Sequence, residues 1–431
     1  MRHGHGALMS PHGVILFAMR SSDLRLITRG LVLILLFAQA ALVSCSRQPV
    51  EQHPTLDPAG GEQGGTQETP VLEVAGFFDN EEMTLFLRHP TTNPSWYHQV
   101  LVFEGGEWVR RGSGADGPDR DGFYEDRISI LWDDGLVENF ATLGGYVAVH
   151  EGMRATRSAA AAEDVRRHPH LGGELGESDV RKFIAESREE RPDTPLWAAV
   201  RSQVELDELR AQGHFLDLWQ WRAHRGNPVG FADNGYVLEY RHSSEGRSAY
   251  STNFDSDAGL PLMMFDPEQT GKRALRLEKL LAREYGQEDL YFLAEDFAIP
   301  FDPDHDWQEG DALPHRLLRE PEGSRGAIRA EGAHRDGAWR VRLTRSMESP
   351  NPLDSIAFEA GAVYHVAFSV HADSTGAIHH LVSHPVTVGF DAEADIVLTR
   401  HTGEGTPSPE DLEWQRLTLF LPSDPTPAPE E

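Results

Sequence analysis

The residues from Tyr124 to Trp132 place the strongest constraint on the fold of this chain. Asp126, Ile128, Ile130 and Trp132 fall on one set of alternating positions, and most residues of the other set are polar. Side chains of a β-strand point alternately to opposite faces, and β-branched and aromatic residues favour strands. The stretch therefore predicts a half-buried β-strand.

The same period of two recurs towards the C-terminal end. Trp339, Val341 and Leu343 alternate with polar residues, and the next such stretch carries Tyr364, Val366, Phe368 and Val370 on one face. Strands of this kind, separated by turns, predict a mainly β, antiparallel β-sandwich. A further strand is expected around 214–224, and a hairpin from Tyr236–Arg241 and Ser248–Thr252 across the turn at 243–246.

Two segments depart from the strand pattern and predict helical insertions, at about 158–212 and 267–285. The first is rich in Ala, Glu and Arg, and 193–195 is expected to begin a helix in it. The apolar stripe of that helix would consist of Leu196, Val200, Val204, Leu206 and Leu209. The second insertion carries four leucines on an Arg- and Lys-rich background. Both are most simply helices that pack on the sheet with one apolar face.

The N-terminal residues indicate export. Arginines precede the apolar run 31–41, which ends in Leu42-Val-Ser-Cys45. This order is typical of a secretory signal, whether translation begins at Met1 or at Met19. The last four residues resemble the lipobox of bacterial lipoproteins, in which the cysteine is acylated. Cys45 is the only cysteine of the chain, so it cannot form an intramolecular disulfide.

The expected organisation follows from these boundaries. A signal segment at 1–44 precedes a disordered tether at 45–70, which is poor in apolar residues. A β-sandwich domain then covers 71–395, and a segment at 396–431 ends in a Pro- and Glu-rich tail. Ser46, rather than Asp, follows the cysteine, which by the same resemblance favours the periplasmic side of the outer membrane.

The charge balance excludes one class of partner. The chain has 39 Lys and Arg against 69 Asp and Glu, which gives a formal net charge of −30. Phosphates would be repelled, so nucleic acid is not expected to bind. The sequence also has no P-loop, no Rossmann fingerprint and no Ser-His-Asp motif context, so we do not expect an enzyme.

Several side chains have the chemistry of a cofactor site. His150 and Met153 combine an imidazole and a thioether, which are residue types that ligate haem iron. Trp219 and Trp221 lie one residue apart on one strand face, where they would stack on a porphyrin or a sugar, or pack in the core. His224 follows them. The histidines around 365–384 leave a zinc site as a weaker alternative.

Three blocks, taken in order, resemble the haem-binding domain of the ethylbenzene dehydrogenase type. They are Tyr124–Trp132, then Asp217–Arg222 with 227–230, and Asp336–Arg345 continuing through Asp354, Phe358, Gly361 and His384. The resemblance implies a β-sandwich related to carbohydrate-binding modules and DOMON domains. It also implies a role like that of periplasmic cytochromes, or of the haem-binding subunit of DMSO-reductase-like molybdoenzymes.

The departures from that family decide which haem is expected. Many relatives have G-C-x-x-C-H where this chain has Gly145 to His150, with Tyr146 and Val149 in place of the two cysteines. Covalent attachment is therefore impossible, and the haem expected is non-covalent haem b. The b-type relatives are thought to use Met and Lys as axial ligands, and relatives often have lysine where Arg222 stands. His150 with Met153, or either with His224, are the substitutes implied.

The sequence thus predicts a lipid-anchored periplasmic protein that binds haem b and transfers electrons to a redox partner, such as a molybdoenzyme or a multihaem cytochrome. The alternative is a haem-free β-sandwich module that binds a carbohydrate or a protein partner. That module would use the aromatic wall of Trp219 and Trp221.

Overall fold

The computed structural model describes residues 69–113, 118–191, 193–376, 380–403 and 405–421. The signal segment, Cys45 and almost all of the tether lie outside the described residues. Among the residues described, no helix is long and apolar enough to cross a membrane.

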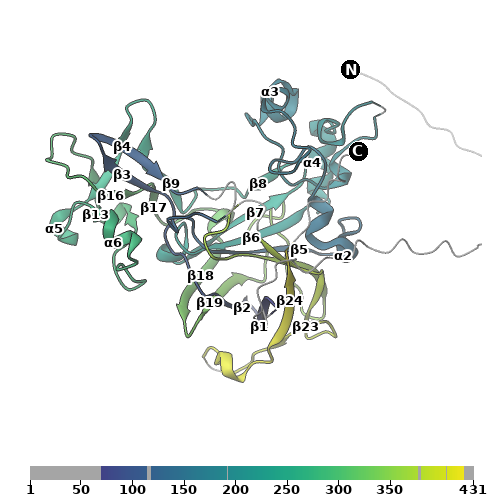
Figure 1. Ribbon diagram of the computed structural model, residues 1–431. Helices are drawn as coiled ribbons and strands as arrows, with labels where there is room; N and C mark the ends of the chain where they lie inside the picture. The colour runs from purple at the N-terminus through teal and green to yellow at the C-terminus, as the bar shows by residue number, and fades with distance from the viewer. Residues whose placement is uncertain (1–68, 114–117, 192, 377–379, 404, 422–431) are drawn as a thin grey trace, which may run out of the picture. The chain divides into compact units, whose positions relative to one another are not determined.

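The main body of the described chain is a closed β-barrel (Figure 1). Its pairing order runs β2-β19-β18-β7-β6-β5-β20-β21-β24-β1, and β1 pairs again with β2, so that ten strands close the circuit. Every pairing in this circuit is antiparallel. The strands are β1 Val71–Phe78, β2 Glu82–Pro90, β5 Arg127–Asp133, β6 Leu216–Arg222, β7 Phe231–Val237, β18 Ile328–Arg335, β19 Ala338–Ser346, β20 Val363–His371, β21 Leu381–Ser383 and β24 Gln415–Phe420.

The mainly β, antiparallel prediction is confirmed, and strand pairing closes both edges that an open sandwich would leave free. Three further strands join this sheet: β8 Arg241–Ser243 on β7, β22 Val386–Phe390 on β20, and β23 Ile396–Arg400, which is parallel to β1 and β22. β23 and β24 come from residues that we expected to lie beyond the domain, so the boundary at 395 is too early.

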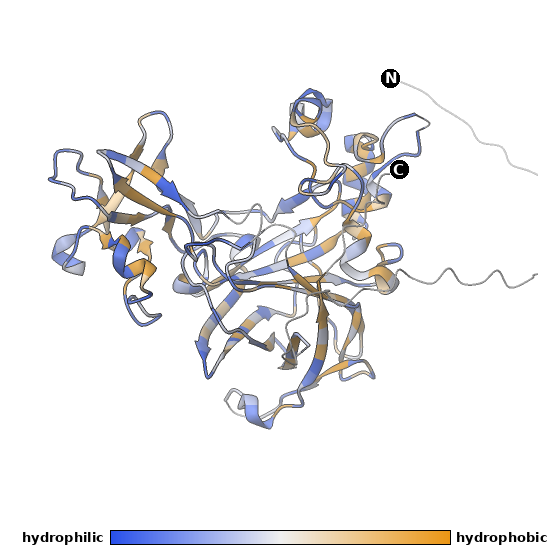
Figure 2. Cartoon of the chain, in the orientation of Figure 1, coloured by the Kyte–Doolittle hydropathy of each residue, from blue (hydrophilic) through white to orange (hydrophobic). Residues whose placement is uncertain are grey.

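The barrel interior is filled by the apolar faces that the alternation predicted. The fully buried side chains include Ile130, Trp132, Trp219, Trp221 and Val366. Figure 2 shows apolar and polar segments alternating along the barrel strands. The core is thus built mainly by residues two apart in the sequence, which is why the strands could be recognised.

A second lobe, formed by residues 97–112 and 250–318, has its own hydrophobic core. Tyr97, Leu101, Trp108, Phe265 and Leu313 are among its buried residues. Its strands are β3 Val100–Glu104, β4 Glu107–Arg111, β9 Tyr250–Thr252, β10 Phe254–Asp255, β11 Leu260–Pro261, β12 Met263–Phe265, β13 Leu275–Arg276, β14 Leu293–Ala294, β15 Ala298–Pro300, β16 Asp311–Pro314 and β17 Arg316–Leu318. The expected helical insertion at 267–285 is reduced to α5 Pro267–Thr270 and α6 Leu277–Leu281 within this lobe.

The expected hairpin of 236–241 with 248–252 is wrong. β8 does pair with β7, but β9 pairs with β17 in the second lobe, where Tyr250 lies opposite Leu318. The turn signal at 243–246 therefore marks the point where the chain leaves the barrel. Local turn chemistry did not reveal the partner strand, because that partner is more than 60 residues away.

The insertion at 158–212 contains short helices joined by irregular segments. They are α3 Ala162–Arg167, a π-helical turn at Pro169–Glu174, 3₁₀ turns at Ala185–Ser187 and Leu196–Ala198, and α4 Gln203–Ala211. Only the 3₁₀ turn follows Pro195, and the α-helix α4 begins later, where Ser202 and Glu205 form a capping box. Val204 is 67% exposed and does not belong to the expected apolar stripe.

Candidate functional site

His150 and Met153 lie in one tight turn, because the Met153 N–H donates to the His150 carbonyl at 3.3 Å. The His150 ring stacks on Phe183, with centroids 4.3 Å apart. Burial lowers the pKa of His150. Its Nε2 is buried and has no hydrogen-bond partner in the described chain. His150 is therefore a neutral imidazole with a free nitrogen, as a ligand to iron must be.

Lys182 is a neighbour that the sequence reasoning missed. Its ammonium donates to the Gly145 carbonyl at 3.4 Å, and burial lowers its pKa to about 8. It immediately precedes Phe183, the residue that stacks on His150. The resemblance pointed to a lysine ligand at position 222, so nothing drew attention to a lysine inside the helical insertion.

Trp219 and Trp221 are fully buried in the barrel core. Trp219 packs against Trp132 with ring centroids 5.3 Å apart, and Trp221 packs edge-on against Trp339 at 5.0 Å. The Trp221 indole N–H also donates to the Asn227 side chain at 3.0 Å. The expected aromatic wall is thus part of the core, and neither ring offers an open face to a porphyrin or a sugar.

His150 and His224 lie at opposite ends of β6. The segment that follows Phe183 reaches the beginning of β6, because the Ile184 N–H donates to the Leu238 carbonyl and the adjacent Val237 pairs with Leu216. His224 follows the other end of the strand. Seven residues of β-strand span about 20 Å. These two histidines therefore cannot ligate the same iron, and the pairing of His224 with His150 or Met153 is excluded in this structure.

His224 has one ring nitrogen fixed and one free. Its Nδ1 lies 3.1 Å from the Trp96 carbonyl oxygen, which can only accept, so Nδ1 carries the proton. Nε2 is buried and has no partner among the described residues. The residue is 2% exposed, and burial lowers its pKa to about 4. A backbone carbonyl that fixes the tautomer of an imidazole is the usual arrangement for a metal-ligating histidine.

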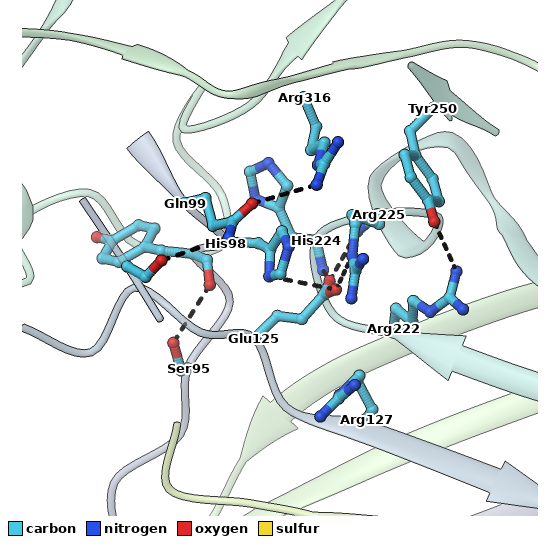
Figure 3. A network of polar contacts seen from close by, with 12 residues as sticks. Ser95, His98, Gln99, Glu125, Arg127, Arg222, His224, Arg225, Tyr250 and Arg316 are labelled. Carbon is cyan, nitrogen blue, oxygen red and sulfur yellow. Dashed lines mark hydrogen bonds and ion pairs between the residues drawn. The ribbon is translucent and has the colours of Figure 1, made fainter. Parts of the chain in front are cut away.

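Glu125 holds the backbone on which His224 stands. This fully buried carboxylate accepts the N–H groups of His224 at 2.6 Å and Arg225 at 2.8 Å, and it pairs with the Arg225 guanidinium (Figure 3). Burial acts to raise the pKa of Glu125, but the charge of Arg225 and the neighbouring donors hold it below the usual value. The sequence placed Glu125 on the polar face of a strand, whereas it lies just before β5 and is buried.

His98 was not recognised from the sequence. Its ring centroid lies 6.4 Å from that of His224, and its Nδ1 is 3.6 Å from Glu125 Oε1 (Figure 3). Burial, together with the charge of Arg225, lowers its pKa well below the usual value, so the ring is neutral. His98 precedes β3 in a loop without periodicity, and only the fold brings it to Glu125.

Arginines surround this group of residues. Figure 3 shows Arg127, Arg222, Arg225 and Arg316 around Glu125 and Tyr250. Arg222 does not contact His150 or Met153; it pairs with Asp233 at 2.8 Å and with Gln220 at 2.6 Å. The position at which relatives often have lysine thus belongs to the same site as His98 and His224.

The donor set fits haem iron, whereas the free space is small. A cavity of about 70 Å³ is lined by Arg222, Asp233 and Tyr250 among others. Pockets for drug-sized ligands measure roughly 300–1,000 Å³. A larger cavity of about 500 Å³ lies elsewhere, and its lining, from Phe77 to Thr406, contains no histidine, methionine or lysine. Neither cavity is lined by His98 or His224, so haem at His224 requires the surrounding side chains to rearrange.

A metal-ion site receives less support. Within the described ranges, no group of three or more His, Cys, Asp or Glu residues is placed to hold a metal ion. Of the histidines considered for zinc, His371 and His380 stack on each other with centroids 4.6 Å apart, and His379 lies outside the described residues.

The comparison with protein families gives one match. The model described as ethylbenzene dehydrogenase covers residues 37–383, which is well over half of the chain. The matched region includes the barrel strands from β1 to β21 and the whole second lobe. A comparison with curated proteins gives no match. The extent of the family match, together with the mainly β fold, shows that the chain belongs to the ethylbenzene dehydrogenase family.

Proposed function

We propose that this protein is a lipid-anchored periplasmic carrier of haem b that transfers electrons and catalyses no reaction of its own. Family membership supports a haem-associated, electron-transfer type of domain. The observation that carries the proposal is the His224 imidazole, which is buried and neutral, is fixed in one tautomer, and has an unpartnered Nε2. Leaving such an acceptor unsatisfied costs stability unless a ligand takes the lone pair.

His98 supplies the second candidate ligand. Its ring centroid lies 6.4 Å from that of His224. Both imidazoles are neutral and buried. When bound, the haem would supply one-electron redox chemistry, and the two histidines would hold its iron.

The sequence explains why the attachment would be non-covalent. Tyr146 and Val149 stand where relatives carry the cysteines that form thioether bonds. Tyr146 is exposed and Val149 is half-buried, and neither side chain has a sulfur to add to a vinyl group. Haem b, held by axial ligands and packing, is the form that this chain can accommodate.

Anchoring and partnership complete the proposal. Cys45 would carry the lipid at the periplasmic side of the outer membrane, and the tether would separate the barrel from the bilayer. The redox partner would be a molybdoenzyme or a multihaem cytochrome.

The experiment is reconstitution of the full mature chain with haemin, followed by acid–acetone extraction. We expect a Soret band and complete extraction. His224→Ala should lose haem or become high spin, and His150→Ala is the matched control that should retain the wild-type spectrum. If His150→Ala loses haem and His224→Ala keeps the wild-type spectrum, the haem site is instead at His150, Met153 and Lys182. No Soret band in any variant would eliminate haem binding.

The haem-free alternative receives no supporting observation at the expected wall. Trp219 and Trp221 are in the core, so a glycan could not stack on them without opening the barrel. Docking of a protein partner would become the leading hypothesis only if haem does not bind.

A further inference from the structure

Three guanidinium groups face one tyrosine ring beside the proposed haem site. The Cζ atoms of Arg222, Arg225 and Arg316 lie 5.7, 5.3 and 5.7 Å from the ring centroid of Tyr250. They come from the end of β6, the loop after it and β17, and Figure 3 shows them converging. We call Arg222, Arg225, Arg316 and Tyr250 the arginine cluster.

The carboxylates in contact with the arginine cluster do not balance its charge. Glu125 pairs with Arg225, and Asp233 pairs with Arg222 at 2.8 Å. Asp233 is, however, shared with a further arginine, Arg325, also at 2.8 Å. Arg316 bonds to the neutral side chain of Gln99 at 3.2 Å. Positive charge is therefore in excess.

Arg127 adds to this excess. Its guanidinium donates to the Thr375 carbonyl at 3.3 Å and lies over the Tyr124 ring at 4.9 Å. Neither partner carries a negative charge. Burial, followed by the neighbouring charges, lowers the pKa of Arg127 to about 10, and burial together with Arg225 also lowers the pKa of Arg316. The neighbouring histidines, His98 and His224, carry no negative charge whether protonated or not, so they do not offset it.

Burial makes the excess costly. The Arg222 side chain is 8% exposed, and its Nε is buried without a hydrogen-bond partner in the described chain. The Nε atoms of Arg127 and Arg316 are also buried and have no hydrogen-bond partner among the described residues. Buried charges are normally paired, because an unpaired one loses its hydration without compensation. Several unsatisfied donors of one charge at one place are the mark of a site for an anion.

We propose that the arginine cluster binds a carboxylate or another oxyanion between Arg222, Arg225 and Arg316. A planar guanidinium donates two parallel hydrogen bonds to such a group, and a neutral ligand would leave the charge excess in place. The anion has two possible sources: a propionate of haem, or a free oxyanion such as phosphate. The first source rests on the proposed function, and the second does not.

The first experiment uses the full mature chain without haem. Sodium phosphate and sodium propionate are titrated at constant ionic strength, and the midpoint of thermal unfolding is followed. A saturable increase is expected, because a ligand that binds only the folded state stabilises it. Arg316→Gln should weaken this binding about tenfold or more, since the substitution removes one guanidinium without leaving a carboxylate unpaired.

The matched control is Arg340→Gln. Arg340 pairs with Asp336 at 2.9 Å on the surface, with side chains 46% and 81% exposed. Its removal changes the net charge equally and should leave the titration unchanged. If Arg340→Gln and Arg316→Gln have the same effect, the anion acts through general charge screening, and the site does not exist.

The second experiment distinguishes the two sources. Haemin is compared with its dimethyl ester, which has no free propionate. A propionate source predicts that the ester binds at least tenfold more weakly, that Arg316→Gln removes this difference, and that bound haemin abolishes the phosphate effect. A free-oxyanion source predicts equal binding of the two haems and a persistent phosphate effect.

The outcomes also separate this inference from the proposed function. A saturable phosphate effect in a protein that binds no haemin would refute the haem proposal and retain the anion site. Haem binding without any ester discrimination or anion effect would retain the haem proposal and overturn the inference. The arginines of the cluster would then have only a structural role, through their contacts with the Tyr250 ring.

Discussion

Arg345 and Asp217 form an ion pair at 2.7 Å whose two side chains are fully buried in the barrel. Asp217 belongs to β6 and Arg345 to β19, so the pair joins the second and third sequence blocks across the core. Asp217 also accepts the Ile356 N–H at 3.0 Å, and the Arg345 guanidinium lies over the Phe358 ring at 4.6 Å. The pair thus links two blocks that are more than 100 residues apart in the sequence.

This pair predicts a large and asymmetric effect on stability. Asp217→Ala should lower the free energy of unfolding by about 3–5 kcal/mol, because it leaves a buried guanidinium without its partner. The double variant Asp217→Leu, Arg345→Met should cost less, since it removes both charges. Equilibrium unfolding in urea measures both.

The control for this prediction is Glu331→Ala. Glu331 pairs with Arg342 at the same distance of 2.7 Å, but the two side chains are 72% and 46% exposed. Exposed pairs contribute about 0–1 kcal/mol. If Asp217→Ala lowers the free energy of unfolding by less than 1 kcal/mol, the Arg345 guanidinium does not depend on Asp217 for compensation of its buried charge.

The barrel strands could be predicted from the sequence because the alternation of apolar and polar residues is a local pattern. Residues two apart, such as Ile128 and Ile130, share a face whichever strands lie beside them. The second lobe was not readable, because its short strands pair over long distances: Val102 lies opposite Ala312. Both faces of β6 are buried. Alternation does not show which faces are covered, so the burial of Trp219 in the core could not be predicted.

Only part of the candidate site could be predicted from the sequence, because its residues come together through contacts that are distant in the chain. His224 was identified, but sequence proximity favoured His150 and Met153 as its companions. The fold places the length of β6 between these residues and brings His98 to His224 instead. The charge excess combines Arg222 and Arg225, which are close in sequence, with Arg316, which comes from β17. No spacing rule in the sequence expresses it.

His170 predicts a pH dependence of stability. Its Nδ1 lies 2.6 Å from Glu174, and its Nε2 lies 3.3 Å from the buried Glu239. The hydrogen bond with Glu239 raises the pKa of His170 above 6.5, against the opposing effect of burial. Protonation is thus more favourable in the folded state. The stability it contributes is fully present below pH 6.5 and is lost as the pH rises through the raised folded value.

The measurement compares wild type with His170→Gln in urea at several pH values. The variant should be less stable by about 1.5–3 kcal/mol at pH 6, as for a hydrogen bond to a charged group, and the difference should shrink at alkaline pH. His365→Gln, on β20, is the control. A difference between wild type and His170→Gln that grows with pH would contradict the assignment.

Cys45 predicts the location of the protein. Because Leu42 to Cys45 resemble a lipobox, Cys45→Ala should abolish acylation and leave the protein soluble or uncleaved. Mass spectrometry of the purified mature chain should find a lipid on the wild type at its first residue. Ser46→Asp should retain the lipid and change the destination membrane. An unmodified Cys45 in the wild type would remove the anchor from the proposal.

His98 provides the sharpest test of the ligand pair. If His98 and His224 hold one iron, His98→Ala should keep some haem through His224 but convert its spectrum from low spin towards high spin. His98→Met should restore a strong second ligand, and a His/Met pair raises the reduction potential above that of the wild type. Optical spectra and a redox titration measure both effects.

The His98→Met variant separates ligation from simple packing. A side chain that merely fills space beside Glu125 would respond to its volume, so alanine would be harmful and methionine nearly neutral, with no change in potential. Ligation predicts recovery of low spin together with a higher potential. Met153→Ala serves as the control, because it lies beyond the far end of β6. If Met153→Ala gives the high-spin spectrum and His98→Ala does not, the iron is at the His150 end of the strand.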